Sequence, residues 1–334
     1  MGERLHYIDI FKGICLILVV VHHAPLALYG GFAEPGTILW YVNNFIIAFF
    51  MPAFFMATGY CSSFKKPFNQ YLWKNVKTIL LPCYCLYYLN RYIQNLDVFL
   101  FGDSSWMSFS HWIAPGIRTF IEEGGFYWFL SSLFIAKLMA WCVNLILNVR
   151  LRILILFLSF GLGLYLYQCT KVDNLFFFQH AMMLMPFLFF GKALRQKENL
   201  LDKYGNFISL GFFIVVMTLS MLDVEIPTIT RNITVTLPRM PLFLVLSVCG
   251  TLTILYVSKL IKTSMVLEFL GKGSLVEYCF NYATLTLVSD MCRSYFNVGG
   301  QIWTIPVVGI TLLFLGGAYW ILNHKYLRFL IGKF

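Results

Sequence analysis

The sequence predicts an all-α polytopic membrane protein, because the chain is very apolar, poor in charge and built around long apolar runs. Of its 334 residues, 59% are hydrophobic and 12% are charged, and its mean hydropathy is +0.74. Soluble proteins contain about 25% charged residues, so this chain has too little charge to cover a soluble body of its size. The composition excludes a soluble globular enzyme, a disordered chain and a small disulfide-rich secreted domain.

The apolar runs predict about ten transmembrane helices. A hydrocarbon core about 30 Å thick needs roughly 20 apolar residues per helix, whereas a membrane β-barrel shows alternating segments of about ten residues. The runs are continuous and favour helices. We expect them at 10–30, 41–63, 76–96, 126–147, 152–169, 175–194, 206–223, 239–258, 274–292 and 302–323.

The distribution of Lys and Arg predicts that both termini are cytoplasmic. Cytoplasmic loops carry an excess of these residues. With the N-terminus inside, 18 of the 25 lie in cytoplasmic segments, five lie outside and two lie within spans. Topology therefore accounts for the net charge of +10 without a nucleic-acid partner. We expect a single integral-membrane domain over residues 1–334, with the lipid bilayer of the cell (inner or plasma) membrane as its surroundings.

The first predicted helix carries ionisable residues that lipid would not accept. The 11-residue step from Lys12 to His23 returns to within about 20° of the same helix face and rises about 16 Å. Asp9 falls within about 40° of that face, and His22 is turned roughly 100° away from His23. A histidine transfers protons near neutral pH, and Lys12 suits an anionic group. The alternative to proton transfer is that a buried histidine only packs against its neighbours, and we favour this role for His22.

Two lysines lie at the start of the third predicted helix, one of them just before it, and one arginine lies within it. Lys74 and Lys77, at positions i and i+3, share a helix face at the cytoplasmic surface, where two ammonium groups suit a polyphosphate. Simple topological anchoring explains them equally well. Arg91 lies deeper, so it must pair, line a polar cavity or extend to the outer surface.

The ninth predicted helix has a polar stripe. Glu277 and Asn281 follow Ser274 at spacings of 3 and 7 residues, which places all three on one interior face. Glu277 and Asn281 could hydrogen-bond to a substrate or to His23. Asp290 and Arg293 are expected to form a structural pair at the outer end. Lys137, within the fourth span, has no partner evident from the sequence.

The outer segment at 97–125 is rich in aromatic and charged residues, including Trp106, His111 and Trp112. Such a surface suits a polar ligand such as a sugar, and interfacial tryptophan anchoring explains it at least as well. The sequence has no nucleotide-binding, zinc-hydrolase or nucleophile-elbow motif. It therefore predicts no metal site and no permanently bound cofactor.

Several segments resemble the integral-membrane acyltransferase 3 family, especially its fucose 4-O-acetylase-like branch. Members of that family typically show a basic residue, ten intervening residues and a histidine in the first helix, as do Lys12 and His23 here. Lys74-x-x-Lys77 followed by Pro82 resembles an Arg-x-x-Arg-type motif of the family. Further similar segments, in the expected order, are 54–60, 128–130, 186–191 and 270–275.

This resemblance implies a ten-helix acyltransferase that moves an acyl group, usually acetyl from cytoplasmic acetyl-CoA, to a hydroxyl of a surface or exported glycan. We expect His23 to act as general base or transient acyl carrier. Two departures stand out: both third-helix basic residues are Lys, which grips phosphate less well than Arg, and Asn281 replaces a histidine common in the branch. The candidate residues are His23, Asp9 and Glu277 for catalysis, Lys12, Lys74 and Lys77 for acyl-CoA, and Arg91, Asn281 and Trp128 for the carbohydrate acceptor.

Two other functions fit the sequence. A transporter or flippase of a glycan intermediate would use the polar stripe as a path, although no internal repeat typical of such proteins is visible. An enzyme with another donor, for example one that transfers succinyl to an exported polysaccharide, would need the same basic and polar residues.

Overall fold

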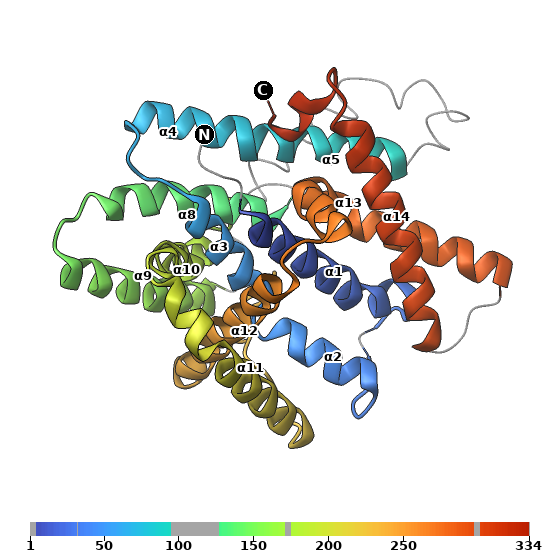
Figure 1. Ribbon diagram of the computed structural model, residues 1–334, viewed down its shortest axis with the longest axis horizontal. Coiled ribbons are helices and arrows are strands. Elements are labelled where there is room, and N and C mark those ends of the chain that lie inside the picture. Colours follow the sequence, from blue (N-terminus) through green and yellow to red (C-terminus); the bar gives the residue numbers. More distant parts are fainter. Residues whose placement is uncertain (1–4, 32, 95–126, 171–174, 297–300, 334) are drawn as a thin grey trace. The chain divides into compact units, whose positions relative to one another are not determined.

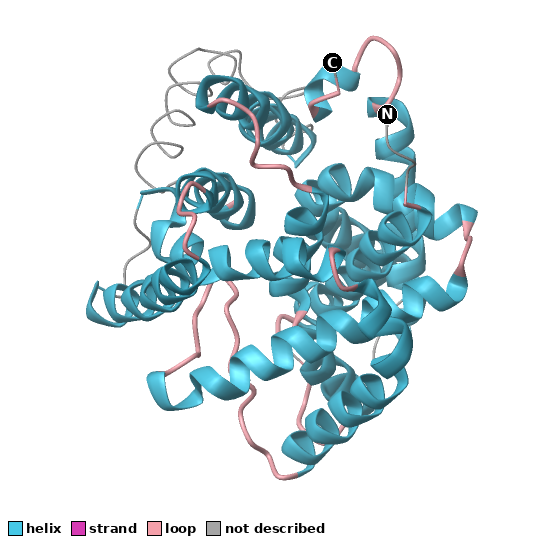
Figure 2. Ribbon diagram, turned by 60° about the vertical axis from the view of Figure 1, so that its left-hand side comes forward, coloured by secondary structure: helices cyan, strands magenta, loops and turns pink. Residues whose placement is uncertain are grey.

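The described part of the chain is mostly helical, as predicted (Figure 2). The computed structural model describes residues 5–31, 33–94, 127–170, 175–296 and 301–333. Over these ranges the only β-type pairing is a single antiparallel bridge between Ile229 and Ile233. The all-α class predicted from continuous apolar runs is confirmed for this part of the chain.

The helices divide into two compact units that alternate along the sequence. The first unit comprises Met1–Tyr60 and Gly191–Ile321, and the second comprises Cys61–Phe190 and Leu322–Phe334. The chain passes between them three times, within helices α3 and α10 and at the last residue of α14 (Figure 1). The single domain expected over 1–334 stays a prediction, and the two units are described separately below.

The first unit is built around helix α1. Its helices are α1 (His6–Tyr29), α2 (Ile38–Ile47), α3 (Phe50–Cys61), the end of α10 (Phe178–Arg195), α11 (Glu198–Met221), α12 (Met240–Ile261), α13 (Met265–Phe296) and α14 (Thr304–Leu322). Helix α1 runs unbroken for 24 residues and ends at Gly30, whose positive φ of 72° lets its N–H bond back to the Leu26 carbonyl. The buried core beside it includes Phe11, Cys15 and Phe49. This packing holds α1 inside the unit.

Helices α1 and α13 approach each other closely because glycine occupies the contact positions, where a larger residue would collide. A Cβ atom on Gly13 would collide with the Leu267 carbonyl, and one on Gly271 would collide with the Asp9 carbonyl. The first residue of α1 contacts the start of α13, and Arg293, near the end of α13, donates to carbonyls at the end of α1. The two helices therefore run in the same direction, as the first and ninth spans of a ten-helix protein would.

The second unit contains a π-helical turn in its first long helix. Its elements are α4 (Phe68–Asn75), η1 (Val76–Leu80), α5 (Leu81–Gln94), α8 (Trp128–Asn144), α9 (Val149–Thr170), η3 (Leu175–Phe177), most of α10 and η6 (Arg328–Ile331). Turn η1 is the π-helix and joins α4 to α5. Helix α8 packs against η1 and α4, and the C-terminal turn η6 packs against α5.

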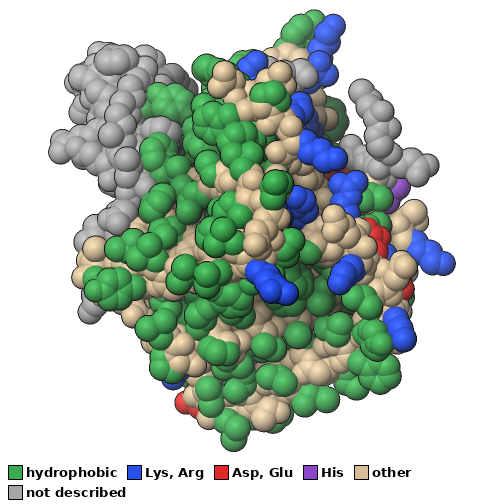
Figure 3. Space-filling model, turned by 90° about the vertical axis from the view of Figure 1, so that its left-hand side faces the viewer, with side chains coloured by type: hydrophobic (Ala, Val, Ile, Leu, Met, Phe, Trp, Pro, Cys, Tyr) green, Lys and Arg blue, Asp and Glu red, His purple; other side chains and the backbone are tan. Residues whose placement is uncertain are grey.

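Six helical segments are long and apolar enough to cross a membrane among the described residues: His6–Tyr29, Ile38–Cys61, Val149–Thr170, Glu198–Met221, Leu237–Ile261 and Gln301–Leu322. Hydrophobic side chains make up much of the surface in view in Figure 3, as a lipid-facing protein requires. The other four predicted spans correspond to α5, α8, α10 and α13, which are shorter or more polar. The count of ten and the cytoplasmic termini stay predictions.

Candidate functional site

The first unit places Lys12 and His23 on one straight stretch of α1. Because the helix is continuous between them, the two side chains are separated by about 16 Å along its axis. Asp9 lies three residues before Lys12, which puts it about 21 Å from His23 along the helix. Asp9 is buried beside Gly271 of α13. The structure therefore does not bring Asp9 to His23.

His22 and His23 have different surroundings. His22 is buried; its Nδ1 lies 2.5 Å from Oδ1 of Asn43 on α2, and its ring packs on Phe50. Those contacts fit the expected packing role. The His23 ring lies 4.8 Å from the His22 ring and 6.2 Å from the Tyr282 ring, between centroids. Its Nδ1 is buried and makes no hydrogen bond within the described residues.

Glu277 is a buried carboxyl group that lacks a hydrogen-bond partner among the described residues. It is 0% exposed, and neither of its oxygens is hydrogen-bonded there. The buried Oδ1 of Asn281, one turn further along α13, is also unbonded in this part of the chain. Asp9 lies opposite Gly271 and His23 beside Tyr282, so Glu277 lies at a level between Asp9 and His23. Unsatisfied buried polar groups are costly and concentrate at functional sites.

Gly273 makes room for Glu277. A Cβ atom at this position would lie 2.5 Å from Glu277 Oε1 and 2.6 Å from the Tyr319 ring. The glycine one turn before Glu277 is thus a close contact point for the carboxyl group and for α14. The sequence indicated this polar helix face, and the structure shows that it is buried.

A hydrogen-bond network at the start of α1 was missed by the sequence analysis. The hydroxyl of Tyr7 lies 2.5 Å from that of Tyr60 and donates to Glu198 at 3.0 Å. Lys259 pairs with Glu198 at 3.7 Å and with Asp202 at 2.7 Å. These residues are far apart in the sequence, and no spacing rule relates them. The network joins α1, α3, α11 and α12 at one end of the unit.

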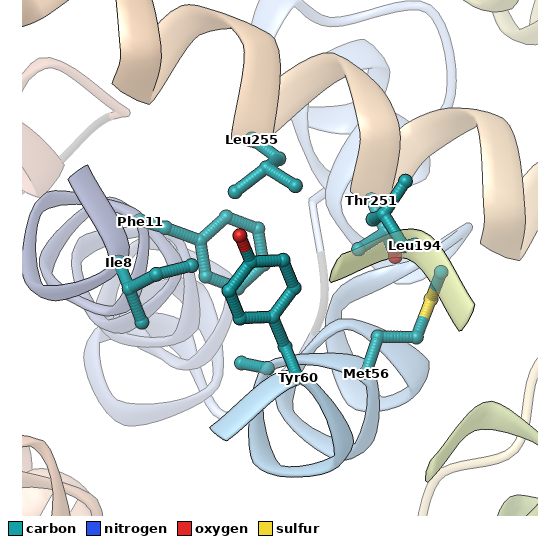
Figure 4. Close-up of a pocket in the computed structure, with 8 residues that line it drawn as sticks. Ile8, Phe11, Met56, Tyr60, Leu194, Thr251 and Leu255 are labelled. Atoms are coloured by element: carbon teal, nitrogen blue, oxygen red, sulfur yellow. The ribbon is translucent and has the colours of Figure 1, made fainter. Parts of the chain in front are cut away.

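A small apolar cavity lies beside this network (Figure 4). Its volume is about 10 Å³, and it is lined by Ile8, Phe11, Met56, Ala57, Tyr60, Leu194, Thr251 and Leu255. A cavity of this size has room for about one water molecule. It is too small for an acyl donor or a sugar, so we assign it to packing.

At the same end, Glu268 connects α13 to the first residue of α1. Its Oε2 lies 2.9 Å from Nδ1 of His6 and 3.5 Å from the Lys272 ammonium. The hydrogen bond from His6 lowers the pKa of Glu268 below its ordinary value, and the nearby Lys272 acts in the same direction. At the far end of α13, Asp290 and Arg293 pair at 3.4 Å. That pairing confirms the sequence prediction.

The second unit carries Lys74 and Lys77, both exposed. Lys74 lies in the last turn of α4 and Lys77 lies in the π-helical turn η1. Residues at positions i and i+3 share a face only in a regular α-helix, and here the wider π-helical turn begins between the two lysines. π-Helical turns are frequent at functional sites. Lys137 on α8 is close enough to Lys74 for their charges to interact.

The described part of the second unit holds cations without carboxylates. The five Asp and Glu residues of this unit, Asp97, Asp103, Glu122, Glu123 and Asp173, lie outside the described residues. Its eleven described Lys and Arg residues are Lys65, Lys66, Lys74, Lys77, Arg91, Lys137, Arg150, Arg152, Lys325, Arg328 and Lys333.

Arg91 and Trp128 each lie beside aromatic side chains of the second unit. Arg91 donates to the Tyr87 hydroxyl at 3.1 Å, and the Tyr87 ring lies 6.4 Å from that of Tyr127, the neighbour of Trp128. The Trp128 ring in turn lies 5.3 Å from His180. His180 is fully buried, and we did not single it out from the sequence. The sequence feature that could have indicated it is the Gln179-His180 pair inside an apolar run.

The candidate residues thus divide between the units. His23, Asp9, Glu277, Lys12 and Asn281 lie in the first unit, and Lys74, Lys77, Arg91 and Trp128 lie in the second. The aromatic segment at 97–125 lies outside the described residues. In the first unit the structure packs α1, which carries His23, against α13, which carries Glu277. In the second unit Arg91 contacts Tyr87, whose ring lies near that of Tyr127, the residue before Trp128.

The chain matches one family model along nearly its whole length. The acyltransferase 3 model, described as an acyltransferase domain, matches residues 5–323. Comparison with curated proteins and with solved structures gave no match. The match includes every candidate residue named above. The chain therefore belongs to the acyltransferase 3 family and is a membrane acyltransferase.

Proposed function

We propose that this enzyme is an O-acyltransferase that moves an acyl group, in the first instance acetyl, from cytoplasmic acyl-CoA to a hydroxyl of a cell-surface or exported glycan. The observation that carries the proposal is the pairing of α1 with α13. It places His23, whose buried Nδ1 has no hydrogen bond among the described residues, on a helix packed along the one that carries Glu277, whose carboxyl oxygens also have none there. Both groups are of the kind that transfers protons.

In this proposal His23 is the general base. The imidazole accepts the proton of the acceptor hydroxyl while the hydroxyl oxygen attacks the thioester carbonyl. The carbon–sulfur bond then breaks, CoA leaves as a thiolate, and the proton from His23 protonates that sulfur. In the variant mechanism, a His23 nitrogen attacks the thioester carbonyl, the carbon–sulfur bond breaks and CoA leaves as a thiolate. The acceptor hydroxyl then attacks the acylated imidazole, the carbon–nitrogen bond breaks, and the hydroxyl proton passes to the CoA sulfur. Glu277 and Asn281 orient the reacting groups, and Asp9 stabilises the helix crossing.

The donor is held by positive charge. Lys74 and Lys77 hold the CoA phosphates as point charges, and Lys12 adds a positive charge toward the inner end of α1. The excess of positive charge in the second unit, 13 Lys and Arg residues against five Asp and Glu residues in its sequence, supports this assignment, because it attracts an anion. No permanently bound cofactor is needed, since acyl-CoA is a co-substrate.

The acceptor is assigned to the aromatic side chains beside Arg91 and Trp128, with Asn281 as a further polar contact. Aromatic rings stack on sugar faces through apolar contact, and a guanidinium donates several hydrogen bonds to hydroxyls. A glycan acceptor agrees with the resemblance of the first helix to the fucose 4-O-acetylase-like branch. We expect the protein in the cell (inner or plasma) membrane, facing exported material.

Two alternatives differ in testable ways. Succinyl in place of acetyl would leave His23 and the lysines with the same roles and change only the donor. A transporter or flippase of a glycan intermediate would need no base, and membership of an acyltransferase family speaks against it.

The test is to incubate the purified protein in lipid nanodiscs with radiolabelled acetyl-CoA, or succinyl-CoA, and a panel of glycan acceptors. We expect label on one acceptor from acetyl-CoA. If only succinyl-CoA transfers label, the donor is succinyl-CoA and not acetyl-CoA. Movement of an unmodified glycan across vesicles, without label transfer from either donor, would overturn the proposal.

A further inference from the structure

The C-terminal segment of the second unit, residues 324–333, contacts the π-helical turn that carries Lys77. Turn η6 (Arg328–Ile331) packs against α5, and the red C-terminal end is drawn next to α5 in Figure 1. Gly332 makes the closest approach: a Cβ atom there would lie 2.9 Å from the Lys77 carbonyl oxygen and 2.9 Å from the Thr78 Cα. The positive φ of Gly332, 72°, also favours glycine at this position.

This segment is strongly basic. Arg328 and Lys333 flank the close approach, and the Lys333 N–H bonds to the Arg328 carbonyl at 3.1 Å. Both residues are exposed. The Lys333 ammonium donates to Asn323 at 2.8 Å. The segment therefore brings two more cations to the turn that holds Lys77.

The chemistry of these cations differs from that of the lysines on α4 and η1. An ammonium acts on phosphate as a point charge, whereas a planar guanidinium binds two phosphate oxygens at once. Arg328 is the one arginine among the basic residues of this segment and of residues 65–77. It supplies the bidentate contact that Lys74 and Lys77 cannot make. The family match ends at residue 323, before the segment begins.

We propose that residues 324–333 complete the phosphate-binding site of the second unit, with Arg328 and Lys333 binding phosphate groups of the acyl donor beside Lys74 and Lys77. The inference rests on the proposed function for its donor, acyl-CoA. The same chemistry would also bind the phosphates of anionic lipid headgroups, and the experiment separates the two sources.

The experiment measures the dissociation constant of radiolabelled acetyl-CoA for the full-length protein in nanodiscs of phosphatidylcholine, and again with added phosphatidylglycerol. Competition by pantetheine, which lacks phosphates, runs in parallel. The variants are Arg328→Ala/Lys333→Ala and Gly332→Val, which dislodges the segment without changing its charge. Lys65→Ala/Lys66→Ala is the matched control, because it removes two exposed lysines of the same unit.

We expect the Arg328→Ala/Lys333→Ala and Gly332→Val proteins to bind acetyl-CoA about tenfold more weakly in neutral nanodiscs, as the loss of charge-assisted phosphate contacts requires. Competition by pantetheine and the control variant should change less than twofold. A wild-type affinity in both variants would overturn the inference, as would an equal loss for pantetheine. An effect confined to anionic nanodiscs would assign the cations to lipid. If wild-type protein binds no acetyl-CoA, the proposed donor is wrong, whatever the variants do.

Discussion

The two units of the protein differ in their balance of charge. By sequence, the first unit has 12 Lys and Arg residues and 10 Asp and Glu residues, whereas the second has 13 and five. Nine of the ten carboxylates of the first unit lie among the described residues, whereas all five of the second unit lie outside them. The nine carboxylates are Asp9, Glu34, Glu198, Asp202, Asp223, Glu225, Glu268, Glu277 and Asp290.

This difference suggests a division of labour. Proton transfer needs groups that gain and lose charge in a buried setting, and the first unit has His23 and Glu277. Binding a phosphorylated donor needs an excess of fixed positive charge, and the second unit has that, with 13 Lys and Arg residues against five Asp and Glu residues. We therefore expect changes in the first unit to reduce turnover and changes in the second to weaken substrate binding.

The largest effect is expected at His23. Replacement with alanine removes the proposed base, and general-base catalysis contributes about 10²–10⁴-fold, so kcat should fall by that range. His22→Ala is the matched control and should cost far less, because His22 packs against Asn43 and Phe50. The measurement is acetyl transfer to the best acceptor of the panel. Normal turnover by folded His23→Ala protein would disprove the role of His23.

The helix crossing of the first unit should be the next most sensitive feature. Gly271→Ala places a Cβ atom against the Asp9 carbonyl, and overpacking of this kind costs about 1–3 kcal/mol or more. The second unit offers the control Gly161→Ala, where a Cβ atom meets open space. We expect a lower thermal unfolding midpoint in detergent for Gly271→Ala alone. Equal midpoints for the two variants would show that the crossing is not tight.

Glu277 tests whether the buried carboxyl group acts in the reaction. Glu277→Gln keeps the shape and removes the ionisable group, so we expect kcat to fall about tenfold to a hundredfold, less than for a general base. Asp290→Asn, on the same helix but exposed and paired with Arg293, is the control. An unchanged kcat with an unchanged pH profile would limit Glu277 to packing.

The lysines of the second unit should affect the donor rather than turnover. Lys74→Ala/Lys77→Ala removes two point charges from the phosphate site, and we expect KM for acetyl-CoA to rise about tenfold, as lost charge-assisted contacts predict. The value of kcat should change little. The effect should shrink at high salt, since exposed charges are screened within about 10 Å at 0.1 M. A fall in kcat at constant KM would contradict the division between the units.

The smallest effect concerns acid stability of the first unit. The His6 hydrogen bond depresses the pKa of Glu268, so ionised Glu268 adds stability above its ordinary pKa, and that stability is lost as the pH falls through the depressed value. His6→Ala should move the acid-unfolding midpoint to higher pH. His324→Ala, an exposed histidine of the second unit, is the control. No movement relative to that control would show that the bond contributes nothing.

The features readable from the sequence are those set by local periodicity. The helical class, the continuous helix from Lys12 to His23, the buried polar face at Glu277 and the Asp290–Arg293 pair all depend on spacings within one helix. Each is found in the structure.

The features that could not be predicted from the sequence depend on contacts between distant segments. The Tyr7–Tyr60–Glu198 network joins residues separated by up to 191 positions, and the π turn at Lys77 shifts a helix that the apolar pattern predicts as regular. The close approach of Gly332 to the Lys77 backbone is also a contact between distant segments. Packing decides such features, and hydrophobic periodicity does not record it.

The most direct test of the division between units is the affinity of His23→Ala protein for radiolabelled acetyl-CoA, measured by equilibrium binding in neutral nanodiscs beside Lys74→Ala/Lys77→Ala protein. The account predicts that the His23 variant, which has lost turnover, binds the donor within twofold of wild type, whereas the lysine variant binds it about tenfold more weakly. Loss of donor binding in the His23 variant, with binding retained in the lysine variant, would contradict it.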